Sequence, residues 1–236
     1  MTWRIGLLLP SANAVMEGDF FRGLPHDASL HVGRMYLRDA TSSSEERMLD
    51  RFALPAATAL ETVTPDVVVF DGGGAPFVAG RQYEHELSDQ IARATGAAVI
   101  GVRSAVVDAL RATQSRRIAV VTPHGDSVNG RIKAWLEGEG FEVSVMRGMD
   151  LSYADAAAMT PDGVYSFVQS SIGPRVPGGA LLMAGTNVQA MRALSLLEMT
   201  YDVPIVTSNL AALQAVRRRL AELRERGMAT SPQLSS

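Results

Sequence analysis

The 236-residue chain contains no cysteine and only four histidines. The absence of cysteine excludes disulfides, thiolate metal sites and cysteine nucleophiles. No two histidines stand four residues apart, the spacing that places two imidazoles on one helix face for zinc. We therefore expect neither a metal site nor any other cofactor, although carboxylates could still hold a weakly bound ion.

Long apolar runs and an excess of positive charge are also missing. No apolar run reaches the roughly 20 residues that cross a bilayer, and the N-terminus enters a strand pattern directly instead of a signal peptide. The net charge is −3, and the 22 basic residues are scattered without forming a continuous stripe. We therefore expect a cytoplasmic globular protein that binds neither nucleic acid nor membranes.

One pattern recurs at a fixed offset. The segment 4–10, which begins Arg-Ile and ends in proline, returns as 117–123, a shift of 117 − 4 = 113 residues. Gly72 follows an apolar run, as Gly185 does, and again 185 − 72 = 113. A unit of this length is a half-domain and not a solenoid repeat, so it predicts two lobes related by approximate twofold symmetry. The cleft between the lobes is the expected place for a functional site.

Short apolar runs alternate with longer amphipathic stretches, which is typical of buried parallel strands connected by helices. The pattern predicts an α/β fold of two pseudo-symmetric Rossmann-like lobes, each a four-stranded parallel sheet flanked by helices. The eight expected strands are 4–9, 29–36, 66–71, 98–102, 117–122, 142–146, 180–184 and 204–207.

Several helix ends carry local signals. Thr160-Pro161 suits an N-cap and first turn, and Gly96 suits a stop after a helix over 82–95. Ser43 with Glu46 matches a capping box before a helix over 44–62, which Pro55 is expected to kink or split.

The lobe boundary is expected in the polar stretch just before the second Arg-Ile. We assign 1–114 to the N-terminal lobe and 115–208 to the C-terminal lobe, with the helix 209–227 packing back on the first lobe. Residues 228–236 are rich in Ser, Pro and Gln, which predicts a disordered tail.

Polar residues and glycines follow the expected strands. Ligands of open parallel sheets bind beyond the carboxyl ends of the strands, so these residues are the first candidates for a site. Glycines there let backbone N–H groups approach a small anion, although a plain tight turn also explains a glycine triplet. No dinucleotide fingerprint is present, because the triplet lacks the G-x-G-x-x-G spacing. The binding candidates are Ser11, Asn13, Gly72, Gly73, Gly74, Gly185, Thr186 and Asn187.

A set of short motifs follows in order along nearly the whole chain: 9–13 with 15–17, Arg34, the glycine segment 72–80, 117–123 with 128–129, 185–187 and 204–209. With these motifs the chain resembles the aspartate/glutamate racemase superfamily, and within it the maleate isomerase and arylmalonate decarboxylase branch. The resemblance implies two lobes that enclose a small carboxylate substrate, and it adds Asn129 to the binding candidates. Members of this superfamily often self-associate, so the resemblance allows a homo-oligomer, although the sequence shows no exposed apolar stripe that argues for one independently.

The resemblance also exposes a departure. Typical members place one cysteine at the end of a strand in each lobe, and the matching positions here are Gly72 and Gly185. Glycine supplies neither a proton nor a nucleophile, so the usual mechanism lacks its reacting groups. His124 stands where the branch usually has a tyrosine, and Asp71 directly precedes the first missing cysteine.

His124 and Asp71 are the candidates for proton transfer. The unperturbed pKa of histidine lies near neutrality, which suits an acid or base, while a structural histidine is the alternative. Asp71 could be a base whose pKa burial raises, or it could cap the following turn. An ionised Asp71 would repel a carboxylate, so either it points away or the ligand carries a positive group.

The leading interpretation is a cofactor-independent enzyme of the maleate isomerase or arylmalonate decarboxylase type that acts on a small carboxylate through an enolate-like intermediate. The alternative is a catalytically silent protein that binds a small carboxylate or zwitterion, for example of the ectoine-utilisation type within the same superfamily. Isomerase, racemase, decarboxylase and lyase chemistry all stay open. Arg34, Arg38 and Arg103 could each neutralise a carboxylate or simply be solvated.

Overall fold

The apolar runs form two parallel sheets. The computed structural model describes residues 2–39, 41–73, 76–225 and 227, with the side chains of all but 42 and 76–82. The predicted Gly74 and the tail 228–236 lie outside the described residues. One sheet has the order β2-β1-β3-β4 and the other β6-β5-β7-β8. The strands are β1 (Trp3–Pro10), β2 (Ala28–Met35), β3 (Val67–Phe70), β4 (Ala98–Gly101), β5 (Arg117–Thr122), β6 (Glu142–Gly148), β7 (Ala180–Met183) and β8 (Ile205–Thr207).

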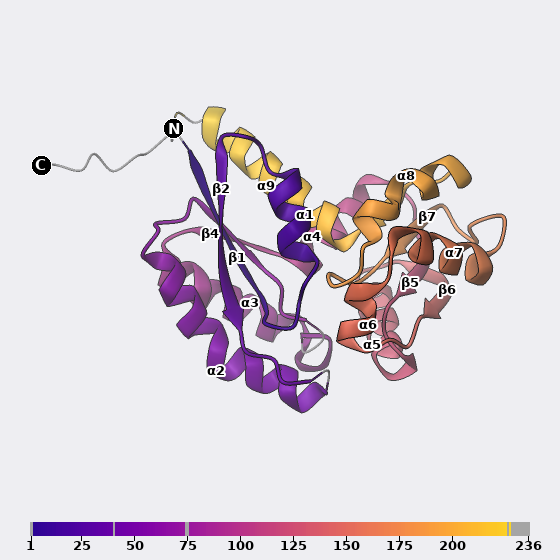
Figure 1. The fold of residues 1–236 in the computed structure, drawn as a ribbon, viewed down its shortest axis with the longest axis horizontal. Coiled ribbons are helices and arrows are strands. Elements are labelled where there is room, and N and C mark those ends of the chain that lie inside the picture. The colour runs from indigo at the N-terminus through magenta and orange to yellow at the C-terminus, as the bar shows by residue number, and fades with distance from the viewer. Residues whose placement is uncertain (1, 40, 74–75, 226, 228–236) are drawn as a thin grey trace, which may run out of the picture.

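Helices flank both sheets (Figure 1); α4 leads from the first sheet to the second, α9 follows the last strand, and the others connect parallel strands within one sheet. They are α1 (Met16–Gly23), α2 (Ser42–Glu61), α3 (Pro76–Thr95), α4 (Val102–Ala112), α5 (Asp126–Gly138), α6 (Tyr153–Ala158), α7 (Pro161–Ile172), α8 (Ala190–Thr200) and α9 (Ser208–Glu225). The predicted α/β fold of two four-stranded parallel sheets is therefore confirmed.

The sequence repeat is also a repeat of strand pairing. In the first sheet Ile5 lies opposite Val67, and in the second Ile118 lies opposite Ala180. The offsets are equal, because 118 − 5 = 113 and 180 − 67 = 113. The central strand pair of each half, β1 with β3 and β5 with β7, therefore forms in the same register, whereas a bulge after Ile118 shifts the pairing of β5 with β6.

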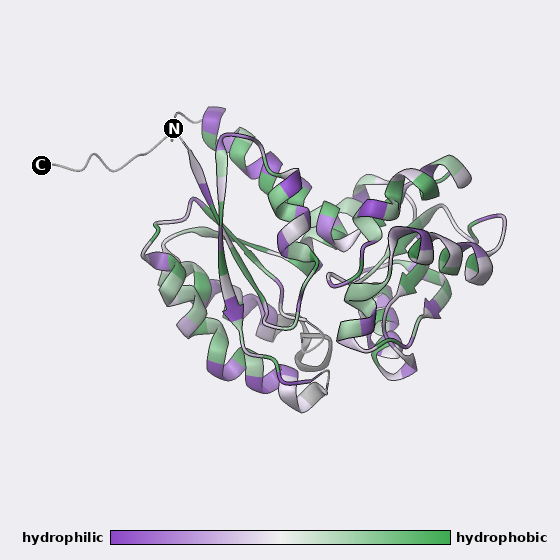
Figure 2. Ribbon diagram, viewed as in Figure 1, coloured by the Kyte–Doolittle hydropathy of each residue, from purple (hydrophilic) through white to green (hydrophobic). Residues whose placement is uncertain are grey.

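Both faces of each sheet are covered, which explains why the strands are apolar almost throughout. A central cluster joins side chains of the two lobes, among them Leu7, Val69, Val120 and Leu182. Separate clusters lie under α2 and α3 in the first lobe and under α7 and α8 in the second. Figure 2 shows the apolar strands inside and the polar faces of the helices turned outward.

The helix-end predictions had mixed outcomes. Thr160 caps α7 by accepting the N–H of Gly163 at 3.1 Å, and Gly96 follows α3, as predicted. The capping box was wrong, because Thr41 caps α2 and accepts the N–H of Ser44 at 3.3 Å. Pro55 does not split α2, which runs through it as one helix. Pro55 is exposed, so water can satisfy the carbonyl that loses its helical partner.

The C-terminal helix α9 ties the lobes together. It begins where β8 ends in the second lobe and packs along α4 and α1 of the first (Figure 1). Arg217 donates to the carbonyl of Gly23, and Arg224 pairs with Asp27 at 2.6 Å.

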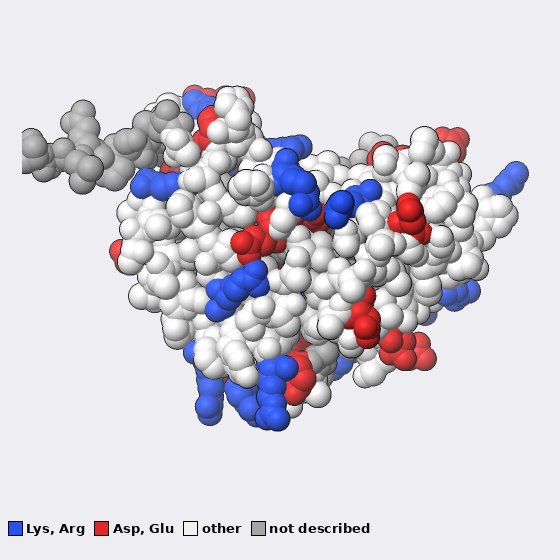
Figure 3. Space-filling view, viewed as in Figure 1, with Lys and Arg blue, Asp and Glu red and all other residues white. Residues whose placement is uncertain are grey.

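None of the helices in the described part of the chain combines the length and apolar character of a membrane span. On the face drawn in Figure 3, basic and acidic side chains are interspersed and form no continuous positive stripe.

Candidate functional site

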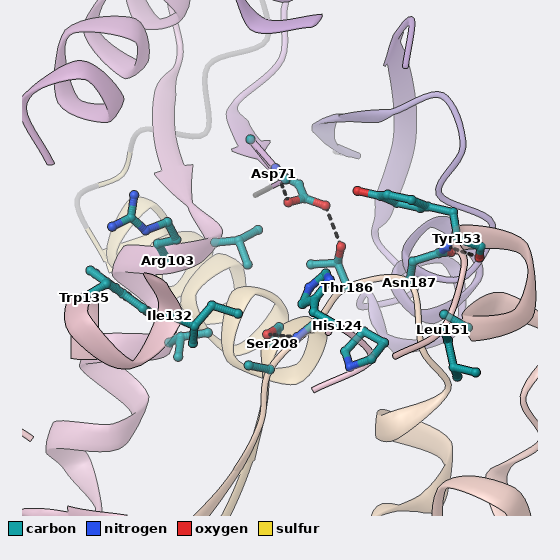
Figure 4. A pocket seen from close by; sticks show the side chains of 18 of the residues that line it. Asp71, Arg103, His124, Ile132, Trp135, Leu151, Tyr153, Thr186, Asn187 and Ser208 are labelled. Atoms are coloured by element: carbon teal, nitrogen blue, oxygen red, sulfur yellow. Dashed lines mark hydrogen bonds between the residues drawn. The ribbon is translucent and has the colours of Figure 1, made fainter. Parts of the chain in front are cut away.

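The carboxyl ends of strands from both sheets meet at a pocket between the lobes (Figure 4). Its volume of about 90 Å³ exceeds several times the roughly 10–15 Å³ that one water molecule needs, which suits a small ligand. The first lobe contributes Phe70, Asp71, Gly72, Gly73, Glu84, Val102, Arg103 and Val106. The second contributes Pro123, His124, Ile132, Trp135, Leu151, Ser152, Tyr153, Ala156, Ala184, Gly185, Thr186 and Asn187, with Ser208 at the start of α9.

Asp71 places a buried carboxylate on the pocket wall. The residue is 4% exposed and directly follows β3. Its Oδ1 accepts the N–H of Gly73 at 3.1 Å, and its Oδ2 accepts the hydroxyl of Thr186 at 2.6 Å. Gly73 has φ of +64°, which glycine adopts without strain and which folds the turn back on the carboxylate. Asp71 thus caps this turn with one oxygen, while the other links the two lobes.

Burial is the main influence on the charge of Asp71. It raises the pKa of the carboxyl, and the hydrogen bonds from Thr186, Gly73 and Asn13 oppose that rise only in part. Among the described residues, no lysine or arginine forms an ion pair with it.

A chain of donors orients Thr186 toward Asp71. The Oδ1 of Asn13 accepts the N–H groups of Val15 and Met16, each at 3.0 Å, at the start of α1. These donors fix the amide, so its Nδ2 faces Thr186 and donates to Oγ1 at 2.9 Å. The Thr186 hydroxyl accepts from Asn13 and therefore directs its own proton to Asp71. Asn13 is 1% exposed and does not line the pocket, so the structure places it behind the site and not against a ligand.

Asn187 joins three segments at the same edge. Its Oδ1 accepts the N–H of Ala14 at 2.8 Å, and its Nδ2 donates to the carbonyl of Tyr153 at 2.8 Å. Both Thr186 and Asn187 line the pocket, as expected for binding candidates, but their side chains already serve the contact between the lobes.

The backbone at Gly185 excludes a side chain. Its φ is +135°, a region that residues with a Cβ rarely adopt, and a Cβ built there would lie 2.7 Å from Cδ of Pro123. Its N–H donates to Oγ of Ser208 at 3.1 Å. The Gly73 and Gly185 N–H groups therefore already donate to Asp71 and Ser208, so these two N–H groups are not available to bind an anion as the sequence predicted.

His124 faces the pocket with a neutral ring. Burial lowers the pKa of this partly exposed imidazole from 6.5 to about 4, so it carries no charge at neutral pH. Among the described residues the ring has no hydrogen-bond partner, which leaves both nitrogens for a ligand. The backbone is held in place, because its N–H donates to Thr122 at 3.0 Å and its carbonyl accepts from Asn129 at 2.9 Å.

Other candidates support the site from outside. Asn129 does not line the pocket and instead holds the loop that carries His124. The Oγ of Ser11 accepts the N–H of Leu37 at 2.9 Å, also away from the pocket. Arg34 pairs with Glu17, and Arg38 is exposed, so of the three arginines considered only Arg103 reaches the pocket wall.

A buried ion pair on α3 and α4 was not foreseen. Glu84 lies 3.1 Å from Arg103, and the Arg103 guanidinium stacks over the ring of Trp135 at 4.8 Å. Burial raises the pKa of Glu84, Arg103 opposes the rise, and the charge of Asp71 adds to it. Glu84 and Trp135 lie within helices, so a search of strand ends could not find them.

Tyr153, at the start of α6, was also missed. Its hydroxyl is aimed toward Asp71 in Figure 4 and donates a long hydrogen bond of 3.5 Å to Glu45. Burial and the charges of Glu45 and Asp71 raise the pKa of Tyr153, so the phenol stays protonated at neutral pH. It is therefore a neutral donor on the pocket wall.

The described residues contain no group of three or more His, Asp or Glu side chains arranged to hold a metal ion. The chemistry available from these residues is proton transfer by Asp71 and hydrogen-bond donation by His124, Tyr153 and backbone N–H groups.

Comparison with known proteins identifies relatives along nearly the full length. The family model described as arylmalonate decarboxylase matches residues 5–231. The maleate isomerase of Nocardia farcinica is 24% identical over 229 residues, covering 92% of this chain and 90% of that protein. The arylmalonate decarboxylase of Bordetella bronchiseptica is 26% identical over 216 residues, covering 90% and 89%.

Solved structures share the fold. The maleate isomerase Iso of Pseudomonas putida S16 superimposes with a TM-score of 0.86 at 22% identity, covering 94% of both chains. A Nocardia farcinica maleate isomerase mutant, solved with a covalently bound succinylcysteine intermediate, gives 0.84 at 22% identity and the same coverage.

Proposed function

The chain belongs to the arylmalonate decarboxylase family, and from this membership we propose that it is an enzyme that forms an enolate-like intermediate from a small carboxylate without using cysteine. The observation that carries the proposal is the buried carboxylate of Asp71 on the pocket wall, whose pKa burial raises. The pocket size suits a substrate of the size of the maleate bound to the P. putida S16 relative.

Asp71 is proposed as the proton-transfer group. In its ionised form it removes a proton from a saturated carbon bonded to the substrate carboxylate, and the C–H electron pair moves into that carboxylate to give an enediolate. Protonated Asp71 then returns the proton to carbon. In a decarboxylation, the breaking C–C bond supplies the electron pair as carbon dioxide leaves, and protonated Asp71 delivers the proton. A raised pKa strengthens the carboxylate as a base and keeps part of it protonated closer to neutral pH.

His124 and Tyr153 are proposed as the groups that stabilise the enediolate. Burial lowers the pKa of His124 to about 4, so the imidazole is neutral at pH 7. The neutral ring can donate an N–H hydrogen bond to the enediolate without transferring its proton. The Tyr153 phenol stays protonated, and its one proton becomes a second donor to the ligand when it turns away from the long bond of 3.5 Å to Glu45. Preorganised donors of this kind stabilise charge that develops in the transition state.

One observation favours the second candidate function, a catalytically silent protein that binds a small carboxylate or a zwitterion. The resemblance places a cysteine of related enzymes at Gly185, and here Pro123 occupies the space that a side chain at this position would need. A protein that had lost one reacting group and closed the gap would keep its pocket and lose turnover.

Proton exchange separates the two candidates. Purified protein is incubated in heavy water with maleate, an arylmalonate, a hydantoin, aspartate and ectoine-pathway intermediates, and deuterium at carbon is followed by NMR. We expect incorporation or product with at least one of these compounds, and its loss by 100-fold or more in Asp71→Asn. Binding of a compound without exchange or product would support the silent protein, and unchanged exchange in Asp71→Asn would refute the role of Asp71.

A further inference from the structure

We propose that the ligand of this pocket carries a cationic nitrogen beside its carboxylate, and that Asp71 provides the counter-charge for it. The inference rests on the proposed function for the carboxylate half of the ligand. It adds a substrate class, the small zwitterions, which differs from the dicarboxylate bound to the P. putida S16 relative.

The first step is that Asp71 faces the pocket. The residue lines the wall, and at 4% exposure its carboxylate is only weakly solvated by bulk water. Of the two possibilities left by the sequence, a carboxylate turned away and a ligand with a positive group, the first does not fit this position.

The second step is that the surroundings of Asp71 supply donors. The Thr186 hydroxyl reaches Oδ2 at 2.6 Å and the Gly73 N–H reaches Oδ1 at 3.1 Å. The proton of Thr186 points to Asp71, because the amide of Asn13 donates to the same hydroxyl at 2.9 Å. Both carboxylate oxygens therefore accept, an arrangement that suits the ionised form.

The third step is a count of charge on the wall. The described lining residues include the carboxylates of Asp71 and Glu84 and the guanidinium of Arg103, while His124 is neutral at pH 7. Arg103 and Glu84 face each other at 3.1 Å, so their charges are matched. The charge of Asp71 has no such match among the described residues, and a buried carboxylate without a counter-charge is unfavourable. A dicarboxylate would add like charge, whereas a ligand ammonium or amidinium would offset it.

Titration calorimetry with matched pairs tests the charge class directly. Aspartate is compared with succinate, and β-alanine with propionate, at pH 8 and constant ionic strength, because each pair differs chiefly by the ammonium group. We expect the aminated member to bind at least tenfold more tightly. In Asp71→Asn the difference should fall below twofold. The control Asp202→Asn makes the same change of charge at an exposed residue outside the pocket and should keep the wild-type difference.

A pH titration of the wild-type protein gives a test that needs no variant. As the pH falls and Asp71 becomes protonated, the preference for the aminated member should shrink, because the carboxylate that attracts it is lost. Equal or tighter binding of succinate at pH 8, an ammonium preference that survives in a folded Asp71→Asn, or failure of every aminated probe to bind would overturn the inference. Binding is read independently of turnover, so an ammonium preference without proton exchange would refute the proposed enzyme and leave the zwitterion site standing.

Discussion

Restoring a side chain at Gly185 should destabilise the protein strongly. The φ of +135° is one that an L-residue holds only with strain, of about 1–3 kcal/mol. A Cβ would also lie 2.7 Å from Cδ and 2.9 Å from Cγ of Pro123, well inside contact distance. Overpacking of this kind in a close-packed region adds about 1–3 kcal/mol. We therefore expect Gly185→Ala or Gly185→Cys to lower the free energy of unfolding by about 2–6 kcal/mol, against a total of about 5–15 kcal/mol for a typical protein.

The assay is urea unfolding followed by circular dichroism, with matched variants. Gly138→Ala is the control, because Gly138 is exposed at the end of α5 and a Cβ there meets nothing within 4 Å. It should leave stability unchanged or raise it by about 1 kcal/mol. Pro123→Ala combined with Gly185→Ala should recover the part of the loss that comes from the contact with the proline ring, but not the part that comes from φ.

The refuting result is simple to state. If Gly185→Ala unfolds within about 0.5 kcal/mol of the wild type, a size typical of unremarkable surface changes, the backbone is not closed around this glycine. If Gly185→Ala is strongly destabilised, Gly185→Cys alone will not place a thiol in the pocket, because the segment 184–186 must first shift away from Pro123.

Four other substitutions test the contacts of His124, Glu84, Asn13 and Tyr153. In the wild type, the folded His124 ring binds fewer protons than the unfolded chain does between pH 6.5 and about 4, so the free energy of unfolding should decrease by up to about 3 kcal/mol as the pH falls through this window. His124→Gln should flatten this pH dependence. Unfolding titrations at pH 7 and pH 4 check this, and an unchanged pH slope would contradict it. Glu84→Gln should destabilise by about 3–5 kcal/mol because it leaves the Arg103 guanidinium buried without its carboxylate, and a melting temperature close to that of the wild type would argue against it. Asn13→Ala should lower the free energy of unfolding by about 2–3 kcal/mol, because it removes the acceptor for the N–H groups at the start of α1 and the donor to Thr186. The control is Ser152→Ala, which removes only the N-cap of α6 and should cost about 1 kcal/mol. Equal losses would show that the hydrogen bond between Asn13 and Thr186 adds nothing to stability. Tyr153→Phe should fold normally and lower any turnover found by about 10-fold or more, as removal of a donor to developing charge does, and unchanged turnover would remove Tyr153 from the site.

The fold and the location of the pocket followed from local pattern. Short apolar runs separated by helical stretches determine parallel strands buried on both faces, and the offset of 113 residues reappears as equal pairing of Ile5 with Val67 and of Ile118 with Ala180. The carboxyl ends of parallel strands meet at one edge, so the sequence alone predicts Asp71, His124 and Thr186 near one another at a cleft, and all three line the pocket.

The sequence could not assign the partners of these side chains. Asn13 and Asn129 were expected at a ligand, yet Asn13 holds α1 and Thr186, and Asn129 holds the loop of His124. An amide pairs with whichever donors and acceptors the fold brings within about 3 Å, and these lie as far as 173 residues away in the chain.

Only the tertiary structure brought in the pocket residues that lie on helices. Glu84, Trp135 and Tyr153 belong to α3, α5 and α6, and helix packing turns them toward the strand ends. The sequence by itself predicted two lobes with a small-ligand pocket between them, and its lack of cysteine excluded thiol chemistry. The packing of the lobes decided that Asp71 is buried without a cationic partner among the described residues and that Gly185 has no room for a side chain, because both properties depend on contacts between segments distant in sequence.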